Sequence, residues 1–127
     1  MRNRFLLLLI FAIFVSGCGG VAENAPAEAT MHYLQALAEQ DKTKVTTLSC
    51  KEWEEQSAME VDALLSVNSE LVDLSCEVMG EDGEDKLVQC NGELRLTYQD
   101  EIRTIDLSRR VYSMRMEDGS WRVCSYK

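Results

Sequence analysis

The sequence predicts an α+β fold in which three N-terminal helices pack on a four-stranded antiparallel meander. Two observations carry this prediction. Apolar residues recur at helical spacing over residues 26–66, whereas from Val67 onward they alternate with polar residues at every second position. Half-polar strands suit an antiparallel sheet with one wet face, and helices that come first in the chain can cover its other face. Residues 26–127 are therefore expected to form a single domain.

Each expected helix has its own start signal. Pro26 and Glu28 suit a first helical turn, Asp41 can cap a second short helix, and Ser49-Cys50-Lys51-Glu52 fits a capping box for a third. The inward faces are expected to carry Met31, Leu34, Leu37 and Ala38, then Val45 and Leu48, then Trp53, Val61, Leu64 and Leu65. These stripes have the spacing of helices that are buried on one side.

The strands are delimited by acidic and glycine-containing turns. Such turns are expected at Asp82-Gly83, Gln99-Asp100 and Glu117-Asp118-Gly119. The inward phase of the third strand changes partway along, as a bulge near Ser108-Arg109 would produce.

Residues 1–17 have the features of a secretory signal peptide. Arg2 and Arg4 precede an uninterrupted apolar run from Phe5 to Val15. A helix of that length rises about 16 Å, roughly half of a ~30 Å hydrocarbon core, so it suits a signal-peptide core better than a membrane span.

Val15-Ser16-Gly17-Cys18 resembles a bacterial lipobox. The resemblance implies cleavage before Cys18, a diacylglycerol on its sulfur and an acyl chain on its amine, which together give stable membrane anchoring. Residues 18–25 would then be the lipidated N-terminus and a short tether. Gly19 resembles residues that permit sorting to an outer membrane, facing the periplasm; in a cell with one membrane the anchor would lie on its outer face.

Four further cysteines are expected to form two disulfides. They lack the close CxxC pairs of a zinc site, and an exported protein matures in an oxidising compartment. Cys76 and Cys90 lie symmetrically about Gly83 and share an inward phase, so they should be cross-strand neighbours. Cys50 is then left for Cys124, although Cys124 and Trp121 cannot both point straight at the helices.

The helices-first order is similar to that of the cystatin-like, nuclear-transport-factor-2-like superfamily. The segments that resemble small bacterial lipoproteins of this group are Tyr33-Leu34-Gln35-Ala36-Leu37, Asp41-Lys42, Leu48-Ser49-Cys50, Trp53-Glu54 and Trp121-Arg122-Val123-Cys124. The resemblance implies a curved sheet and, in many members, a pocket between helices and sheet. Its members include enzymes, binding modules and assembly factors, so it does not select a function.

Charge and residue types exclude several functions. Without residues 1–17 the chain keeps 11 basic against 22 acidic residues, a net charge of −11, which argues against nucleic acid and against a polybasic contact with lipid headgroups. His32 is the single histidine and no catalytic partner can be assigned to it. The acidic run Glu81–Asp85 lacks the spacing of a calcium loop. No catalytic residue, metal or cofactor is therefore expected.

The remaining candidates for a site are aromatic. Pocket residues are expected among Tyr33, Trp53, Tyr98, Asp106, Tyr112 and Trp121, with Arg110 as a further polar group. The alternative is that these side chains simply fill the core of a small domain.

Together these features favour a non-enzymatic envelope lipoprotein that binds a small ligand or an envelope protein. The alternative is a structural subunit that forms a homodimer, or docks on a larger envelope complex, through the open face of the sheet. An enzyme with a cone-shaped pocket is the third possibility. A cavity near Tyr98, Asp106 and Tyr112 would favour ligand binding, and a large apolar patch on the open face would favour the interaction role.

Overall fold

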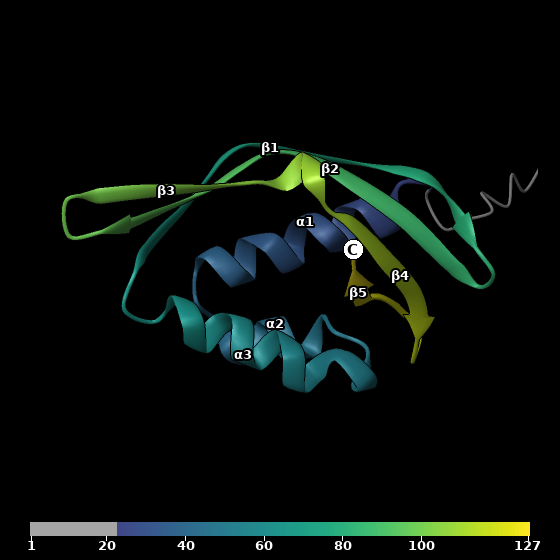
Figure 1. The fold of residues 1–127 in the computed structure, drawn as a ribbon. Helices are drawn as coiled ribbons and strands as arrows, with labels where there is room; N and C mark the ends of the chain where they lie inside the picture. The colour runs from purple at the N-terminus through teal and green to yellow at the C-terminus, as the bar shows by residue number, and fades with distance from the viewer. Residues whose placement is uncertain (1–22) are drawn as a thin grey trace, which may run out of the picture.

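The computed structural model describes residues 23–127. They form an α+β fold of three α-helices followed by an antiparallel sheet, as the sequence predicts (Figure 1). The signal peptide, Cys18 and most of the expected tether lie outside the described residues. Within residues 23–127, none of the helices has the length and apolar character needed to cross a membrane.

The helices begin close to where their start signals lie. They span Ala25–Ala38 (α1), Lys42–Thr47 (α2) and Glu54–Leu64 (α3), and a 3₁₀ turn, Lys51–Trp53 (η1), leads into α3. Asp41 caps α2, because its side chain accepts a hydrogen bond of 3.0 Å from the backbone N–H of Lys44.

The capping box expected at Ser49 is not formed. The Ser49 hydroxyl donates instead to the Val45 carbonyl oxygen, at 2.7 Å. The physical reason is that a capping box needs the Ser49 N–H free for the Glu52 side chain, whereas here it donates to the Thr46 carbonyl oxygen. On either side of Ser49 the backbone is paired with Val123: the Cys50 N–H donates to the Val123 carbonyl oxygen, and the Val123 N–H donates to the Leu48 carbonyl oxygen. The helical turn then begins at Lys51, with Cys50 and not Ser49 as the residue before it.

The sheet is built around one long central strand. Its strands are Asn68–Asp82 (β1), Asp85–Tyr98 (β2), Glu101–Asp106 (β3), Val111–Glu117 (β4) and Ser120–Tyr126 (β5). β1 pairs with one edge of β2, whereas β3 and β4 pair with different halves of its other edge, and β5 pairs with β4. The third strand of the expected meander is thus divided in two.

A turn of 3₁₀ helix, Leu107–Arg109 (η2), separates β3 from β4. The Asp106 side chain accepts a hydrogen bond of 3.0 Å from the Ser108 N–H and so caps this turn. The expected change in which side chains face the core does occur here, but a helical turn causes it and not a bulge. As a result Ile105 lies opposite Leu94, while Tyr112 lies opposite Val88.

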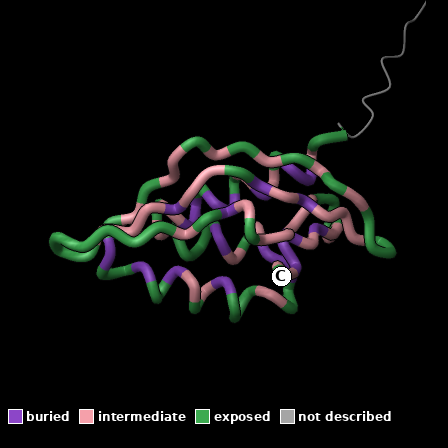
Figure 2. The backbone as a smooth tube through the Cα atoms, turned by 45° about the horizontal axis from the view of Figure 1, so that its top comes forward, coloured by how far each residue is buried: buried purple, intermediate pink, exposed green. Residues whose placement is uncertain are grey.

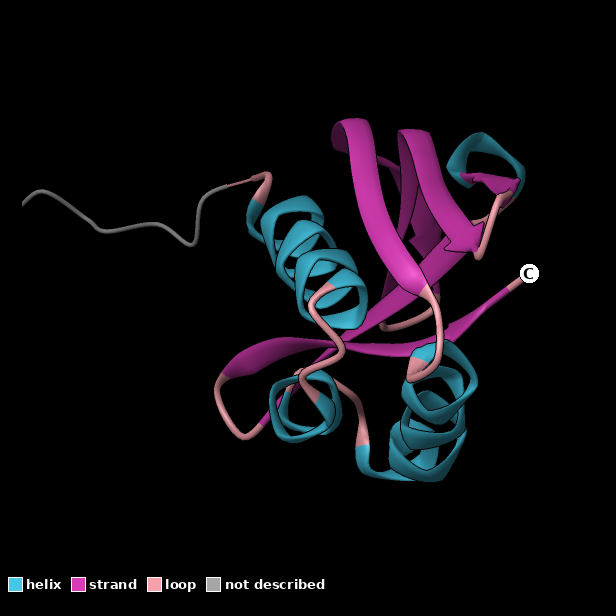
Figure 3. Cartoon of the chain, turned by 90° about the vertical axis from the view of Figure 1, so that its left-hand side faces the viewer, coloured by secondary structure: helices cyan, strands magenta, loops and turns pink. Residues whose placement is uncertain are grey.

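The core lies where the helices face the sheet. α1 lies against the arch of β1 and β2, with α2 and α3 on its far side (Figures 1 and 3), and buried segments gather between the layers (Figure 2). Fully buried side chains come from every layer, among them Tyr33, Val45, Val61, Val88, Tyr112 and Val123.

Two disulfides join the pairs that the sequence predicts. Cys76 and Cys90 are register partners on β1 and β2. Cys50 joins Cys124 and ties the helical layer to β5. The conflict expected between Cys124 and its strand neighbours is relieved at the sheet edge, because residues 48–50 cover β5 and bury Val123 and Cys124 together.

Candidate functional site

A cavity of about 150 Å³ lies between the helices and the sheet. Part of its wall is apolar and is formed by Leu64 of α3 and by Leu94 and Ile105 of the sheet. The polar groups of the wall come from Glu60, Arg110 and Tyr126. A wider hollow of about 640 Å³ shares Ile105, Arg110 and Tyr126 with it, so the cavity opens to the surface at these residues.

Three elements far apart in the sequence position the polar groups. Glu60 lies in the middle of α3, Arg110 lies between η2 and β4, and Tyr126 ends β5. The η2 turn matters for this placement, because it interrupts the strand immediately before Arg110 and lets the chain rejoin β2 at Val111.

Aromatic rings surround the Tyr126 side of the cavity. The Tyr126 ring centre lies 5.7 Å from that of Trp53, edge to face, and 5.6 Å from that of Tyr112. The Arg110 guanidinium carbon lies 4.3 Å from the Tyr126 ring centre, a cation–π distance. These contacts fix the Tyr126 ring from three sides.

Several buried polar atoms around this cluster have no hydrogen-bond partner among residues 23–127. They are the Tyr33 and Tyr112 hydroxyls, Trp53 Nε1 and Glu60 Oε1. An unsatisfied buried polar group costs about 1–3 kcal/mol, so most buried groups in native proteins are paired. Trp121 Nε1 and Arg122 Nε also lack a partner in this part of the chain. The four atoms of this cluster differ from these two because their residues lie close enough to one another, to Tyr126 and to Arg110 to interact without reaching hydrogen-bond geometry.

The surroundings also shift the pKa values of these groups. Burial raises the pKa of the Glu60 carboxyl above its usual value, and nearby Tyr126 and Arg110 offset part of that effect. Burial raises the pKa of Tyr112 to about 12, and it raises that of Tyr33 as well. Both tyrosines are therefore neutral hydrogen-bond donors at physiological pH.

The residues expected to form a pocket are divided between two regions. Tyr33, Trp53 and Tyr112 come together at the cluster just described, but none of the three is among the residues that line the cavity. Asp106 lies on the rim of the wider hollow, where it caps η2. Trp121 lies on β5 opposite Met116 of β4 and is not among the residues that line the cavity.

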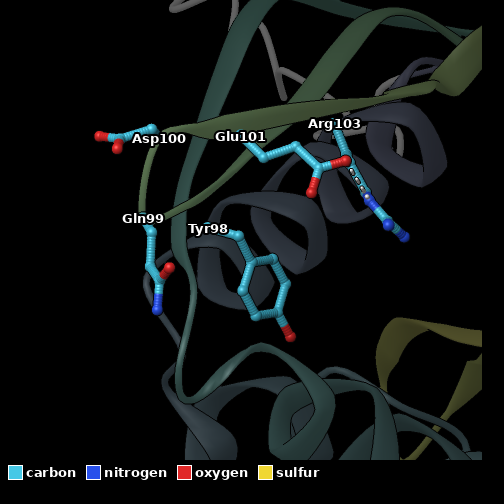
Figure 4. A pocket seen from close by; sticks show the side chains of 5 residues that line it. All are labelled: Tyr98, Gln99, Asp100, Glu101 and Arg103. Atoms are coloured by element: carbon cyan, nitrogen blue, oxygen red, sulfur yellow. Dashed lines mark ion pairs between the residues drawn. The ribbon is translucent and has the colours of Figure 1, made fainter.

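Tyr98 lies away from the cavity, at the turn between β2 and β3. Its side chain borders a surface hollow together with Gln99, Asp100, Glu101 and Arg103 (Figure 4). Glu101 and Arg103 form an ion pair of 3.5 Å there. All five residues are exposed, and this hollow therefore lacks the enclosure of a specific site.

Sequence reasoning missed Glu60 and Tyr126 as site residues. A signal for Glu60 was available, because it lies one helical turn before Leu64 and so shares the inward face of α3. An acidic residue on an otherwise apolar stripe indicates a buried polar site. For Tyr126, by contrast, the edge contact with Trp53 depends on the tertiary structure and leaves no local signal.

Groups suited to a metal are not found in the described part of the chain. Residues 23–127 contain no cluster of three or more His, Cys, Asp or Glu side chains that could hold an ion. His32 is exposed on α1, and Glu81 in the acidic turn is paired with Lys86.

Comparison with solved structures finds the same fold in proteins of low sequence identity. A putative calcium/calmodulin-dependent protein kinase II association domain from Xanthomonas campestris matches with a TM-score of 0.58 and 14% identity over 79% of this chain and 81% of that one. A SEC-C motif containing protein from Rhodopseudomonas palustris matches with a TM-score of 0.54 and 14% identity over 83% and 79%.

A third match spans much less of the other protein. The helical cell shape determining protein Pgp2 from Campylobacter jejuni matches with a TM-score of 0.52 and 7% identity, over 78% of this chain but 38% of that one. No family model matches the sequence, and a search of curated proteins finds no match. The fold is therefore of the nuclear-transport-factor-2-like class, and at these identities the matches carry the fold alone.

Proposed function

We propose that the protein is a lipid-anchored envelope protein that binds a small ligand, without catalysis, in the cavity between its helices and sheet. One observation carries the binding part of this proposal. The buried carboxyl oxygen of Glu60 has no hydrogen-bond partner within residues 23–127 and belongs to a residue of the cavity wall, beside Arg110 and Tyr126. A ligand that hydrogen-bonds to Glu60 offsets the cost of its burial.

The envelope location rests on two separate features. The two disulfides indicate an extracytoplasmic protein, because such bonds persist in oxidising compartments. The match of Val15-Ser16-Gly17-Cys18 to a lipobox supports the finer proposal of a lipid anchor at Cys18. Gly19 after it supports sorting to an outer membrane where the cell has two.

The anchor is tested by a Cys18→Ser variant expressed in its natural host. The variant is expected to leave the membrane fraction or to accumulate as an uncleaved precursor, and to lose labelling by a fatty-acid analogue. Ala22→Ser is the matched control, since it places a serine in the expected tether and leaves the lipobox and both disulfides intact. Unchanged fractionation and labelling of Cys18→Ser would refute the anchor.

The polar character of the outer sheet face favours ligand binding over a structural role. Cys76 and Cys90 face the core, so their strand neighbours face outward, and these are Ser75, Glu77, Gln89 and Asn91. Met79 is an exposed apolar residue beside them, on β1. A surface of this composition is poorly suited to a permanent interface, whose centre is depleted of charge. Sedimentation of the purified protein tests the rival homodimer, and a stable dimer disrupted by Glu77→Arg would support it instead.

Ligand binding is tested by thermal unfolding of the detergent-solubilised full-length protein against a mixed panel of small acids, amines and neutral compounds. We expect at least one compound to raise the melting temperature. Ala63→Leu, which places extra atoms at the cavity wall, should remove that rise, whereas Ala58→Leu on the same helix should keep it. A rise that survives in Ala63→Leu places binding elsewhere, and no rise with any compound removes the proposal.

A further inference from the structure

The guanidinium of Arg110 is the unpaired cation of the cavity. The arginines that form ion pairs within residues 23–127 are Arg95, Arg103, Arg109, Arg115 and Arg122, and Arg110 is not among them. Its contact is with the face of the Tyr126 ring, which occupies one side of the guanidinium plane. The Tyr112 hydroxyl interacts with the guanidinium but does not reach hydrogen-bond geometry. The N–H groups at the guanidinium edge therefore remain available, and a carboxylate is the group whose geometry matches them.

The environment of Arg110 differs from that of its neighbour Arg109. Arg109 lies within 3.9 Å of Asp106, and 85% of its side chain is exposed. Arg110 is partly buried and lines the inner cavity as well as the outer hollow, in a chain where acidic residues outnumber basic ones by 22 to 13. Glu60 lines the same cavity and attracts Arg110, but the two form no ion pair, so the guanidinium is open to a carboxylate that enters the cavity.

The polar residues of the cavity wall favour a ligand that accepts hydrogen bonds. They are Glu60, Arg110 and Tyr126, and the Arg110 guanidinium and the Tyr126 hydroxyl can donate. Burial of Glu60 favours its neutral form, in which it also donates a hydrogen bond. The cavity wall is thus rich in donors.

The size and lining of the cavity limit the rest of the ligand. Ala63, Leu64, Leu94 and Ile105 present apolar surface next to the polar groups. An apolar cavity of about 150 Å³ is large enough to bind benzene, which has six carbons, and this cavity has a similar volume. This volume suits a short hydrocarbon body of about four to six carbons.

We propose that the cavity binds a small carboxylic acid with a short apolar body, whose carboxylate pairs with the guanidinium of Arg110 while its body contacts Leu64, Leu94 and Ile105. This inference rests on the proposed ligand-binding function and names the ligand class. It predicts that Glu60 opposes binding when it is ionised, because two carboxylates then share one cavity.

Protonation of Glu60 should therefore strengthen binding. The other charged or titratable groups around Glu60 are Tyr33 on α1, Arg110 before β4, Tyr112 on β4 and Tyr126 on β5. Tyrosine and arginine side chains keep their charge between about pH 5 and 8. A change of affinity with pH for a ligand of constant charge then reports on Glu60.

The test is calorimetric titration of the full-length protein in detergent micelles, with empty micelles as reference, using pentanoate, pentanamide and pentylamine. Pentanoate is expected to bind at least about tenfold more tightly than the other two. Arg110→Gln should weaken pentanoate about tenfold or more, and Arg110→Lys should weaken it less. Arg103→Gln, an exposed arginine near the β2–β3 turn and away from the cavity, should change it by less than about twofold. Circular dichroism establishes that each variant is folded.

Butanesulfonate, which stays anionic, gives the pH series. Its affinity should rise from about pH 8 to pH 5 in the parent protein and stay level in Glu60→Gln, which should bind more tightly at pH 8. Preference for pentylamine, or loss of binding in Glu60→Gln, would overturn the ligand class while leaving the binding function intact. Undiminished pentanoate affinity in folded Arg110→Gln would overturn the role of Arg110. Failure of every acid, with an amine or neutral compound still active in the thermal panel, would also refute this inference alone.

Discussion

The Arg110 guanidinium carbon lies 4.3 Å from the centre of the Tyr126 ring. This contact joins the start of β4 to the end of β5 and holds the arginine by its face. A cation–π contact contributes about 0.5–1 kcal/mol at an exposed site and more when desolvated, and it leaves the guanidinium edge free. The contact with the Tyr126 ring therefore fixes the position of the Arg110 guanidinium and leaves its charge unpaired within residues 23–127, so the guanidinium can bind an anion.

Removing the buried hydroxyls should cost little stability. Tyr33→Phe and Tyr112→Phe are each expected to change the free energy of unfolding by less than about 1 kcal/mol, because neither hydroxyl has a hydrogen-bond partner within residues 23–127. The corresponding alanine variants should lose about 3–5 kcal/mol through the cavities they leave. Urea denaturation measures both. A loss above about 2 kcal/mol for either phenylalanine variant would mean that its hydroxyl is well bonded in the protein.

Glu60 should destabilise the fold at neutral pH. Burial raises its pKa in the folded state, so the folded chain holds the proton more tightly than the unfolded chain. The free energy of unfolding then falls as pH rises from the unfolded pKa through the folded one, and the loss persists above it. Glu60→Gln lacks this loss and should be more stable than the parent at pH 7, with the difference shrinking toward about pH 4.

The measurement is the difference between the two unfolding free energies at a series of pH values, which cancels the contributions of the other acids. Glu55→Gln, an exposed change on the same helix, is the control and should show no such trend. A Glu60→Gln variant that is less stable than the parent at pH 7 would mean that the ionised carboxylate is favourably paired.

Gly92 should be intolerant of any side chain. Its φ is +100°, and a Cβ atom there would lie within 2.6 Å of the carbonyl oxygens of Val72 and Asp73. The cause is a bulge in β1, where Asp73 and Leu74 stand opposite this single residue of β2. Gly92→Ala is expected to cost on the order of 2 kcal/mol or more. Gly80→Ala is the control, because a Cβ there meets no atom within 4 Å, and an equal cost at both positions would contradict the assignment.

The two disulfides should differ in their contribution to stability. Cys50 and Cys124 are 74 residues apart, and Cys76 and Cys90 are 14 apart. In the chain-entropy model the longer loop contributes about 4.5 kcal/mol and the shorter about 3 kcal/mol. Paired serine replacements, compared by urea denaturation, should show this order. The reverse order would indicate that the bridge between helices and sheet is not the dominant constraint.

The order of elements and the disulfide pairing could be predicted because they depend on periods and symmetry along the chain. Cys76 and Cys90 lie at equal distances from Gly83, and the turn at that glycine sets their register. The capping box at Ser49 could not be judged from sequence, because the backbone there is used by Val123, which lies more than 70 residues away.

The site was predictable only in part. Trp53 and Tyr112 are predicted on inward faces, and their rings do contact Tyr126. Tyr33 is buried as well, although it lies outside the stripe predicted for its helix. Tyr98 has the same pattern but lies beyond the helices, on the β2–β3 hairpin (Figure 1), and is 44% exposed. Alternation in the sequence indicates on which face of a strand a side chain lies, but it does not indicate whether the helices cover that face at that residue.

The central claim is that the cavity, and not the outer face of the sheet, is the binding surface. Backbone amide NMR spectra of the full-length protein in micelles, recorded during titration with pentanoate, test it most directly. The account predicts saturable shifts at Glu60, Ala63, Arg110 and Tyr126, with Ser75, Glu77 and Asn91 unchanged. Saturable shifts confined to those three outward-facing residues would contradict it. The absence of any saturable shift up to about 10 mM pentanoate would contradict it too, because even a weak dissociation constant of roughly 1 mM, about −4 kcal/mol of binding free energy, would be detected in that range.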